Sequence, residues 1–109
     1  KVVTNLEGHA TYMSRSPIPS KTIGLIGPRI KQLGIFFFRL KSLLLFQNLE
    51  KTPLEVSEAV EMLRAIEHGH IIKMVKIDSP CTSVDNPDQR DLVEALMRED
   101  PFWPQYSNK

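Results

Sequence analysis

The chain has 109 residues, of which 41% are hydrophobic and 25% are charged, and its formal net charge is +1. This length is enough for one domain with a modest core. A charge so close to neutral gives no reason to expect a nucleic acid or a membrane surface as partner. The single cysteine, Cys81, excludes an internal disulfide and suits a reducing cytoplasm.

The charges and the apolar residues are unevenly distributed. Residues 1–50 carry seven Lys and Arg against two acids, and residues 51–109 carry seven against eleven. The basic half could face an anionic ligand. The plainer interpretation is that one fold has two oppositely charged halves. The longest apolar run, residues 35–46, is interrupted by charges and is too short to span a bilayer. The chain opens without a Met and without a signal-peptide pattern, so we expect it to be a piece of something longer.

The first 40 residues predict a hairpin, a loop and a strand. Residues 1–15 indicate two short strands around a turn at Glu7 and Gly8. Residues 16–29 contain three prolines and two glycines, which is typical of a long loop. The continuous apolar character of residues 30–40 predicts a buried strand that is covered on both faces. The following residues, 41–51, favour a short helix.

A helix and a further strand come next, and the helix has the clearest local signals. Thr52 is a good N-cap, Pro53 suits the first helical position, and Glu55 completes a capping box. Apolar residues at helical spacing predict one buried face: Val56, Ala59, Val60, Leu63 and Ile66. Gly69 suits the left-handed residue that ends such a helix, and residues 70–77 favour a strand.

A turn is predicted at residues 78–87 and a capped helix at residues 87–98. Asn86 is a good N-cap, Pro87 suits the first helical position, and Gln89 is placed to reach back to the N–H of the cap. This helix start is satisfied without Asp85, whose carboxylate is left over beside a rigid turn.

Residue spacing alone identifies no catalytic group and no metal site. His9, His68 and His70 do not form a zinc pattern, and there is no second cysteine to help them. No glycine-rich phosphate-binding motif is present. The acids of the predicted helices resemble solvated helix faces: Glu55, Glu58, Glu61, Asp88, Asp91 and Glu94. The order of strands and helices favours an α/β layer structure.

Three separated blocks carry a family resemblance. They are EGHATYMSRSPIP, then KQLGIFFFR with TPLEVSEAVEMLRAIEHG, and finally TSVDNPDQRDLVEAL. In this order they resemble three segments from the C-terminal half of CMP-Kdo synthetase, the 3-deoxy-manno-octulosonate cytidylyltransferase family. Those segments are Gly-x-Ala-x-Tyr-x-Ser-Arg-x-x-Ile-Pro, a His-Leu-Gly-Ile-Tyr strand with a Pro-Leu-Glu helix, and Gly-Val-Asp-Thr-Pro-Glu-Asp. The resemblance extends over about residues 2–97.

The resemblance implies a fold and an activity. The fold is an α/β nucleotidyltransferase domain with a central mixed sheet and flanking helices. Residues 1–98 would be its C-terminal portion, which binds sugar and dimerises, and residues 99–109 a tail. The family transfers CMP from CTP to the anomeric hydroxyl of an eight-carbon keto-acid sugar and releases pyrophosphate. The resemblance therefore implies CTP and a sugar acid as substrates, Mg²⁺ as cofactor, a homodimer, and a role in lipopolysaccharide synthesis.

The resemblance also implies binding residues. Asp85 occupies the position of a metal-ligating Asp, although a carboxylate favoured only by the helix dipole is the alternative. Arg15 matches the Ser-Arg pair and would bind the anionic sugar. Glu61 is kept, whereas three other polar positions of the family are changed: Gln32 replaces His, Phe38 replaces Tyr and Met62 replaces Gln. These changes predict a relative of Kdo as the sugar, such as an amino-substituted Kdo or another nonulosonate-like acid.

Features of the family's nucleotide-binding half have no counterpart in the 109 residues. These features are a basic, Gly-containing loop and a first metal-binding Asp. We therefore expect this chain alone to be inactive, with most of the CTP site in the missing half. The alternative from another class is a non-catalytic interaction or dimerisation module, because half a sheet leaves an exposed edge.

Overall fold

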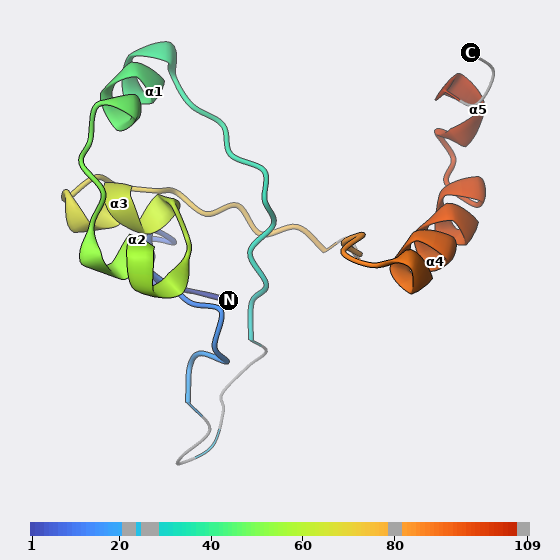
Figure 1. Cartoon of the computed structure of the whole chain (residues 1–109), viewed down its shortest axis with the longest axis horizontal. Coiled ribbons are helices and arrows are strands. Elements are labelled where there is room, and N and C mark those ends of the chain that lie inside the picture. Colours follow the sequence, from blue (N-terminus) through green and yellow to red (C-terminus); the bar gives the residue numbers. More distant parts are fainter. Residues whose placement is uncertain (21–23, 25–28, 79–81, 107–109) are drawn as a thin grey trace. The chain divides into compact units, whose positions relative to one another are not determined.

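Figure 1 shows the computed structural model, whose described residues are 1–20, 24, 29–78 and 82–106. The chain divides into two compact units, Lys1–Lys76 and Ile77–Lys109. The predicted boundary between residues 98 and 99 falls inside the second unit. The loop predicted at residues 16–29 lies partly outside the described residues.

The first unit begins with the predicted hairpin. Strands β1 (Val2–Thr4) and β2 (Ala10–Met13) pair antiparallel, with Val2 opposite Met13. Gly8 has a φ of 75° in the turn, which favours glycine, and the side chain of Asn5 accepts a hydrogen bond from the His9 N–H at 2.8 Å. The hairpin prediction is confirmed.

Three short helices follow in this unit: α1 (Leu40–Gln47), α2 (Pro53–Glu58) and α3 (Met62–Glu67). The prediction of one helix through α2 and α3 is wrong at Ala59, whose φ of 50° and ψ of 47° lie in the left-handed region. There the Ala59 and Val60 N–H groups both bond to the Glu55 carbonyl, which is how a helix closes at its C-terminus. Gly69, with a φ of 79°, follows α3 as predicted.

The core lies between the hairpin and α3. Its buried residues are Val2, Ala10, Met13, Met62 and Leu63. The helix break changes the phase of α2 relative to α3, so the predicted apolar face does not continue through both. Val56 is 69% exposed although the sequence predicts it to be buried.

Two predicted strands are extended segments without a regular ladder. The prediction at residues 30–40 is wrong: only Ile30 forms a bridge, to Val2, and Phe37 is 95% exposed. An apolar run becomes a buried strand only where neighbours cover it, and here Phe36 packs against the core while most of the run stays exposed. Residues 70–77 pass beside the hairpin, where the Ala10 N–H bonds to Ile72 O and the Met74 N–H bonds to Gly8 O, both at 2.9 Å. The α/β fold class is confirmed, with a two-stranded sheet and flanking helices.

The second unit contains α4 (Pro87–Arg98) and α5 (Trp103–Tyr106). The predicted cap is confirmed, because Asn86 Oδ1 accepts the Gln89 N–H at 2.9 Å. The predicted partner of the Gln89 side chain is wrong: it accepts the N–H of Asp85, at 2.7 Å, rather than that of Asn86. Among the helices of the described part of the chain, none combines the length and the apolar character needed to cross a membrane.

Candidate functional site

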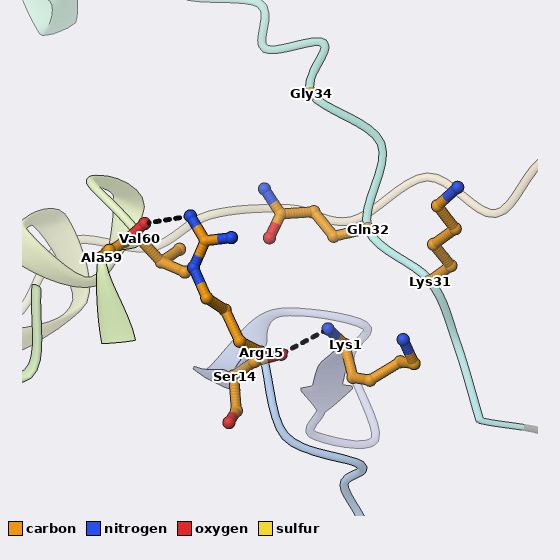
Figure 2. A pocket seen from close by; sticks show the side chains of 8 residues that line it. All are labelled: Lys1, Ser14, Arg15, Lys31, Gln32, Gly34, Ala59 and Val60. Carbon is orange, nitrogen blue, oxygen red and sulfur yellow. Dashed lines mark hydrogen bonds between the residues drawn. The ribbon is translucent and has the colours of Figure 1, made fainter. Parts of the chain in front are cut away.

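An open pocket of about 480 Å³ lies beside the end of β2 (Figure 2). It is lined by Lys1, Ser14, Arg15, Lys31, Gln32, Gly34, Ala59 and Val60. The pocket therefore brings together two predicted binding residues, Arg15 and Gln32, from segments that are far apart in the sequence. In Figure 2 the side chain of Gln32 extends toward the guanidinium of Arg15.

The side chain of Arg15 is held by two backbone carbonyls of the described chain. Its Nε donates to Glu58 O at 3.0 Å, and its Nη2 donates to Ala59 O at 3.1 Å. Both carbonyls belong to the end of α2, where the left-handed Ala59 turns the chain. Carbonyls at a helix C-terminus carry partial negative charge and favour a cation. The helix end thus fixes the guanidinium at the edge of the pocket.

The carboxylate of Glu58 lies close to Arg15 but is bound by neutral groups. Its Oε1 accepts from the Tyr12 hydroxyl and from Ser14 Oγ, both at 2.8 Å, and its Oε2 accepts the backbone N–H of Arg15 at 3.0 Å. These bonds favour the ionised form, so the pKa of Glu58 lies below its usual value of 4.5, with the Tyr12 bond as the largest cause. The same bond raises the pKa of Tyr12 above its usual value.

Arg15 forms no ion pair with any residue that the structure describes. A guanidinium has five N–H groups, and the two carbonyls use two of them. The remaining N–H groups match the planar fork that binds a carboxylate or a phosphate through two parallel hydrogen bonds. The pocket is therefore suited to an anionic ligand.

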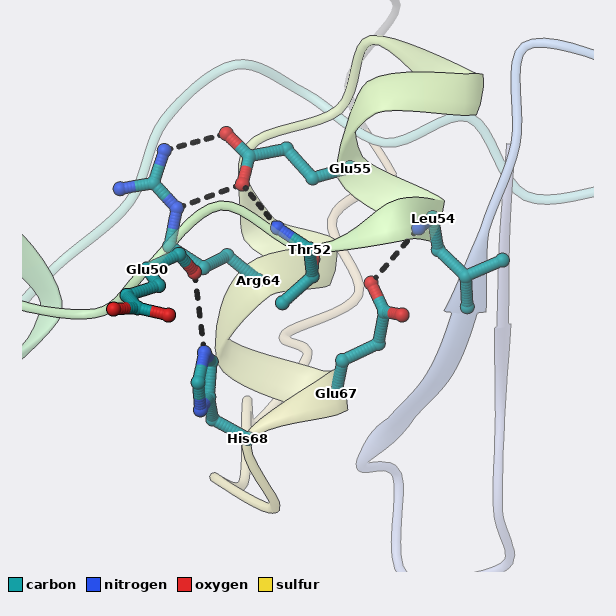
Figure 3. A network of polar contacts seen from close by, with 7 residues as sticks. All are labelled: Glu50, Thr52, Leu54, Glu55, Arg64, Glu67 and His68. Atoms are coloured by element: carbon teal, nitrogen blue, oxygen red, sulfur yellow. Dashed lines mark hydrogen bonds and ion pairs between the residues drawn. The ribbon is translucent and has the colours of Figure 1, made fainter.

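A second polar network joins the ends of α2 and α3 (Figure 3). Arg64 Nε and Nη2 donate to the two carboxylate oxygens of Glu55 at 2.7 and 2.5 Å. Oε2 of Glu55 also accepts the Thr52 N–H at 3.4 Å, which supplies the glutamate half of the predicted capping box. The Arg64 guanidinium lies over the ring of Phe46, 5.1 Å from its centroid.

This second network joins α2 to α3, and none of its residues lines the pocket. Glu67 Oε2 accepts the Leu54 N–H at 3.1 Å, and a ring nitrogen of His68 lies 3.1 Å from Glu50 O. The hydrogen bonds from Arg64 lower the pKa of Glu55, and the pKa of Arg64 is raised in return. The prediction that Glu55 lies on a solvated helix face is wrong, because its side chain is buried against this arginine.

Three other residues predicted from the resemblance lie outside the pocket lining. Glu61 is exposed at the start of α3, and Met62 is 6% exposed within the core. The ring of Phe38 packs at a tilt against Phe46, with 5.7 Å between the ring centroids. Their binding roles stay predictions.

Asp85 lies in the second unit, exposed, directly before the cap of α4. Its carboxylate has no hydrogen-bond partner among the described residues, while its backbone N–H is held by Gln89. Within the described ranges no three His, Cys, Asp or Glu residues gather into a cluster suited to a metal ion. A lone carboxylate nevertheless fits Mg²⁺, which is commonly bound through one or two carboxylates together with substrate phosphates.

Glu58 and Ser14 are the site residues that sequence reasoning missed. Glu58 was grouped with the solvated acids of the helix, yet it is half-buried and binds the end of β2. The available signal was the alternation that places Tyr12 and Ser14 on one side of the strand, with two hydroxyl groups that need an acceptor. Cys81, the single cysteine of the chain, lies outside the described residues.

Comparison with known proteins finds relatives of one kind over about 90% of the chain. No family profile matches it. It is 37% identical over 102 residues to the mitochondrial 3-deoxy-manno-octulosonate cytidylyltransferase of Arabidopsis thaliana, covering 91% of this chain and 35% of that protein. It is 41% identical over 99 residues to the 3-deoxy-manno-octulosonate cytidylyltransferase of Myxococcus xanthus, covering 90% and 40%. The chain spans about two fifths of the length of the curated relatives that it matches.

A solved structure supports the same relationship. The structure of CMP:2-keto-3-deoxy-manno-octonic acid synthetase complexed with CTP matches with a TM-score of 0.82 and 32% identity. The match covers 90% of this chain and 41% of that one. The predicted resemblance to the C-terminal part of the CMP-Kdo synthetase family is therefore confirmed over about 90% of this chain.

Proposed function

We propose that this chain is the sugar-acid-binding part of a CTP-dependent cytidylyltransferase. The complete enzyme transfers CMP to a keto-acid sugar of the 3-deoxy-octulosonate type and releases pyrophosphate. The chain alone does not turn over CTP, because it corresponds to about two fifths of the relatives' length and lacks the expected nucleotide-binding loop. The proposal includes a homodimer and a cytoplasmic location, the latter from the single cysteine.

The position of the Arg15 guanidinium is the observation that carries the proposal. Its guanidinium is fixed by the end of α2, has no ion pair among the described residues, and lines an open pocket. A bidentate pair between this guanidinium and the carboxylate of the sugar acid orients the sugar as well as binding it. Gln32, on the same pocket, offers both a donor and an acceptor to a neighbouring substituent of the sugar.

Asp85 is the residue of this chain that would hold Mg²⁺ in the complete enzyme, with nucleotide phosphates as further ligands. The bound cation would offset charge on the α-phosphate as the new bond forms. Within the chain, the Gln89 amide restrains the backbone of Asp85, and the capped start of α4 fixes the turn. The carboxylate is therefore presented from a rigid local structure.

The test is pyrophosphate release from CTP, Mg²⁺ and a panel of ulosonic acids. It is measured with the 109-residue chain and with a chimaera in which this chain replaces the C-terminal part of the Acaryochloris marina relative, to which it is 40% identical. We expect turnover by the chimaera only, and loss of turnover with Arg15→Ala but not with Lys41→Ala, an exposed cation on α1. Best turnover with a Kdo relative would make Gln32, Phe38 and Met62 specificity residues. A folded chimaera that is silent with every acid, or turnover by the chain alone, would contradict the proposal.

A second candidate, a non-catalytic interaction module, is favoured by the exposed apolar residues around α1. They include Ile35, Phe37, Leu40 and Leu44, which are each more than half exposed. Self-association would be compatible with either function, so the discriminating measurement is the melting temperature. Stabilisation by Mg²⁺ and the sugar acid supports the enzyme, because only a ligand that binds the folded form raises the melting temperature.

A further inference from the structure

We infer that Glu58 is a positioning residue for Arg15, which orients the guanidinium toward the sugar acid without pairing with it. This inference rests on the proposed function, in which Arg15 binds the carboxylate of the sugar. Two features of the first unit support it: the hydrogen bonds that the Glu58 carboxylate accepts, and the hydrogen bonds that the Arg15 guanidinium donates.

The Glu58 carboxylate is bound by three donors that carry no charge. Tyr12 and Ser14 each donate to Oε1 at 2.8 Å, and the Arg15 backbone N–H donates to Oε2 at 3.0 Å. A carboxylate beside an arginine ordinarily forms a bidentate ion pair with it, as Glu55 does with Arg64 in the same unit. The three donors from β2 and its end hold Glu58 in a different orientation, so that it binds the backbone of Arg15 and not its side chain.

The Arg15 guanidinium is consequently placed beside the α2 carbonyls, and no carboxylate of the described residues pairs with it. Nε and Nη2 donate to the Glu58 and Ala59 carbonyls at 3.0 and 3.1 Å. Glu58 thus binds Arg15 in two ways. Its side chain accepts the backbone N–H of Arg15, and its backbone carbonyl accepts the Nε–H of the Arg15 side chain. The terminal nitrogen that makes neither bond points toward Gln32 across the pocket (Figure 2).

This arrangement immobilises the Arg15 guanidinium and leaves N–H groups available to a ligand. A pairing carboxylate would immobilise the guanidinium but would compete with the ligand for the same fork of N–H groups. Neutral carbonyls immobilise it through two N–H groups and leave the others free to bind. Preorganisation of this kind reduces the entropy cost of ligand binding.

The first part of the experiment measures the position of Arg15 without any ligand. In the ¹⁵N-labelled 109-residue chain, the exchange of the Arg15 Nε–Hε proton with water is recorded by NMR. We expect Glu58→Gln to accelerate this exchange about tenfold, because an amide replaces a charged acceptor and the anchor weakens. Tyr12→Phe, which removes one donor, is expected to have a smaller effect in the same direction and covers the case in which Glu58→Gln fails to fold.

Glu55→Gln is the matched control. It removes a carboxylate of the same helix, and this carboxylate binds Arg64 and not Arg15. It is expected to accelerate exchange at the Arg64 Nε–Hε and to leave that at Arg15 unchanged. If Glu58→Gln and Tyr12→Phe leave Arg15 exchange as in the wild type, the inference is wrong and Glu58 only joins β2 to α2.

The second part titrates the chimaera described above with the ulosonic acid of the panel that gives the best turnover, and compares KM with kcat. We expect Glu58→Gln to raise KM about tenfold with little change in kcat, and Arg15→Lys combined with Glu58→Gln to be no worse than Arg15→Lys alone. A KM unchanged by Glu58→Gln overturns the inference even if exchange is faster. If the folded wild-type chimaera has no activity with any acid of the panel but Arg15 exchange depends on Glu58, the proposed function fails while the positioning of Arg15 by Glu58 stands.

Discussion

The two units of the chain are ordered by different means. Lys1–Lys76 contains the buried core residues of the described chain, together with polar networks that join residues more than 40 positions apart, such as Tyr12 and Glu58. In Ile77–Lys109 no described residue is buried, and α4 relies on its cap and on the exposed i,i+4 pair between Glu94 and Arg98. The comparison shows that a well-formed helix start does not require a core, whereas the pocket beside Arg15 does.

The largest expected effect comes from removing a core side chain of the first unit. Leu63 is fully buried, so Leu63→Ala is expected to destabilise this unit by about 2–5 kcal/mol through lost burial and the cavity left behind. Thermal unfolding followed by NMR signals of the hairpin measures it. Leu92→Ala, at a half-exposed position of α4, is the matched control and should change stability by no more than about 0.5 kcal/mol. Equal losses in the two variants would contradict the assignment of the core.

Acid is expected to destabilise the first unit through its two anchored carboxylates. The pKa of Glu55 and that of Glu58 lie below the usual 4.5, so the unfolded state binds more protons than the folded state as the pH falls. Their contribution is fully present above about pH 4.5 and is lost as the pH falls through the folded-state pKa values. Melting temperatures between neutral pH and about pH 3 measure this loss. Glu55→Gln and Glu58→Gln should each flatten the profile, and a wild-type profile without a slope would contradict the two networks.

The smallest effect is expected from the cap of α4. Asn86→Ala removes the acceptor of the Gln89 N–H and is expected to lower the stability of this helix by about 1 kcal/mol. Cα chemical shifts of residues 87–98 report the loss of helicity. Ser83→Ala, at an exposed position before the cap, is the control and should leave these shifts unchanged. Unaltered shifts in Asn86→Ala would show that α4 depends on contacts other than its cap.

Local signals predicted the hairpin and the start of α4 correctly because turn and cap residues act over a few positions. Gly8 and Asn86 each satisfy a backbone requirement that can be recognised from the neighbouring residues. The same reasoning failed at Ala59, where helical periodicity continues through a break whose carbonyls accept hydrogen bonds from Arg15. Propensity and periodicity contain no information about such a distant partner.

The site was predictable in part. The resemblance identified Arg15 and Gln32, which the structure places on one pocket, but it gave no role to Glu58. An acid in a polar helical pattern is usually solvated, and only the folded chain shows that two hydroxyl groups and an N–H converge on this one. The apolar residues around Phe37 were predicted to be buried, but most of them are exposed. An apolar pattern indicates that a segment tends to be buried, and it does not identify the residues that would cover it.

The left-handed conformation of Ala59 limits which residues this position tolerates. An L-residue with a side chain adopts it at a cost of about 1–2 kcal/mol, and a β-branched residue is a genuine outlier there. Glycine or asparagine would keep the bend, so drift toward these residues preserves the carbonyl that holds Arg15. Valine, isoleucine or threonine would favour a straight helix and withdraw that carbonyl. One methyl-bearing residue at the edge of the pocket thus limits how this stretch of sequence can evolve.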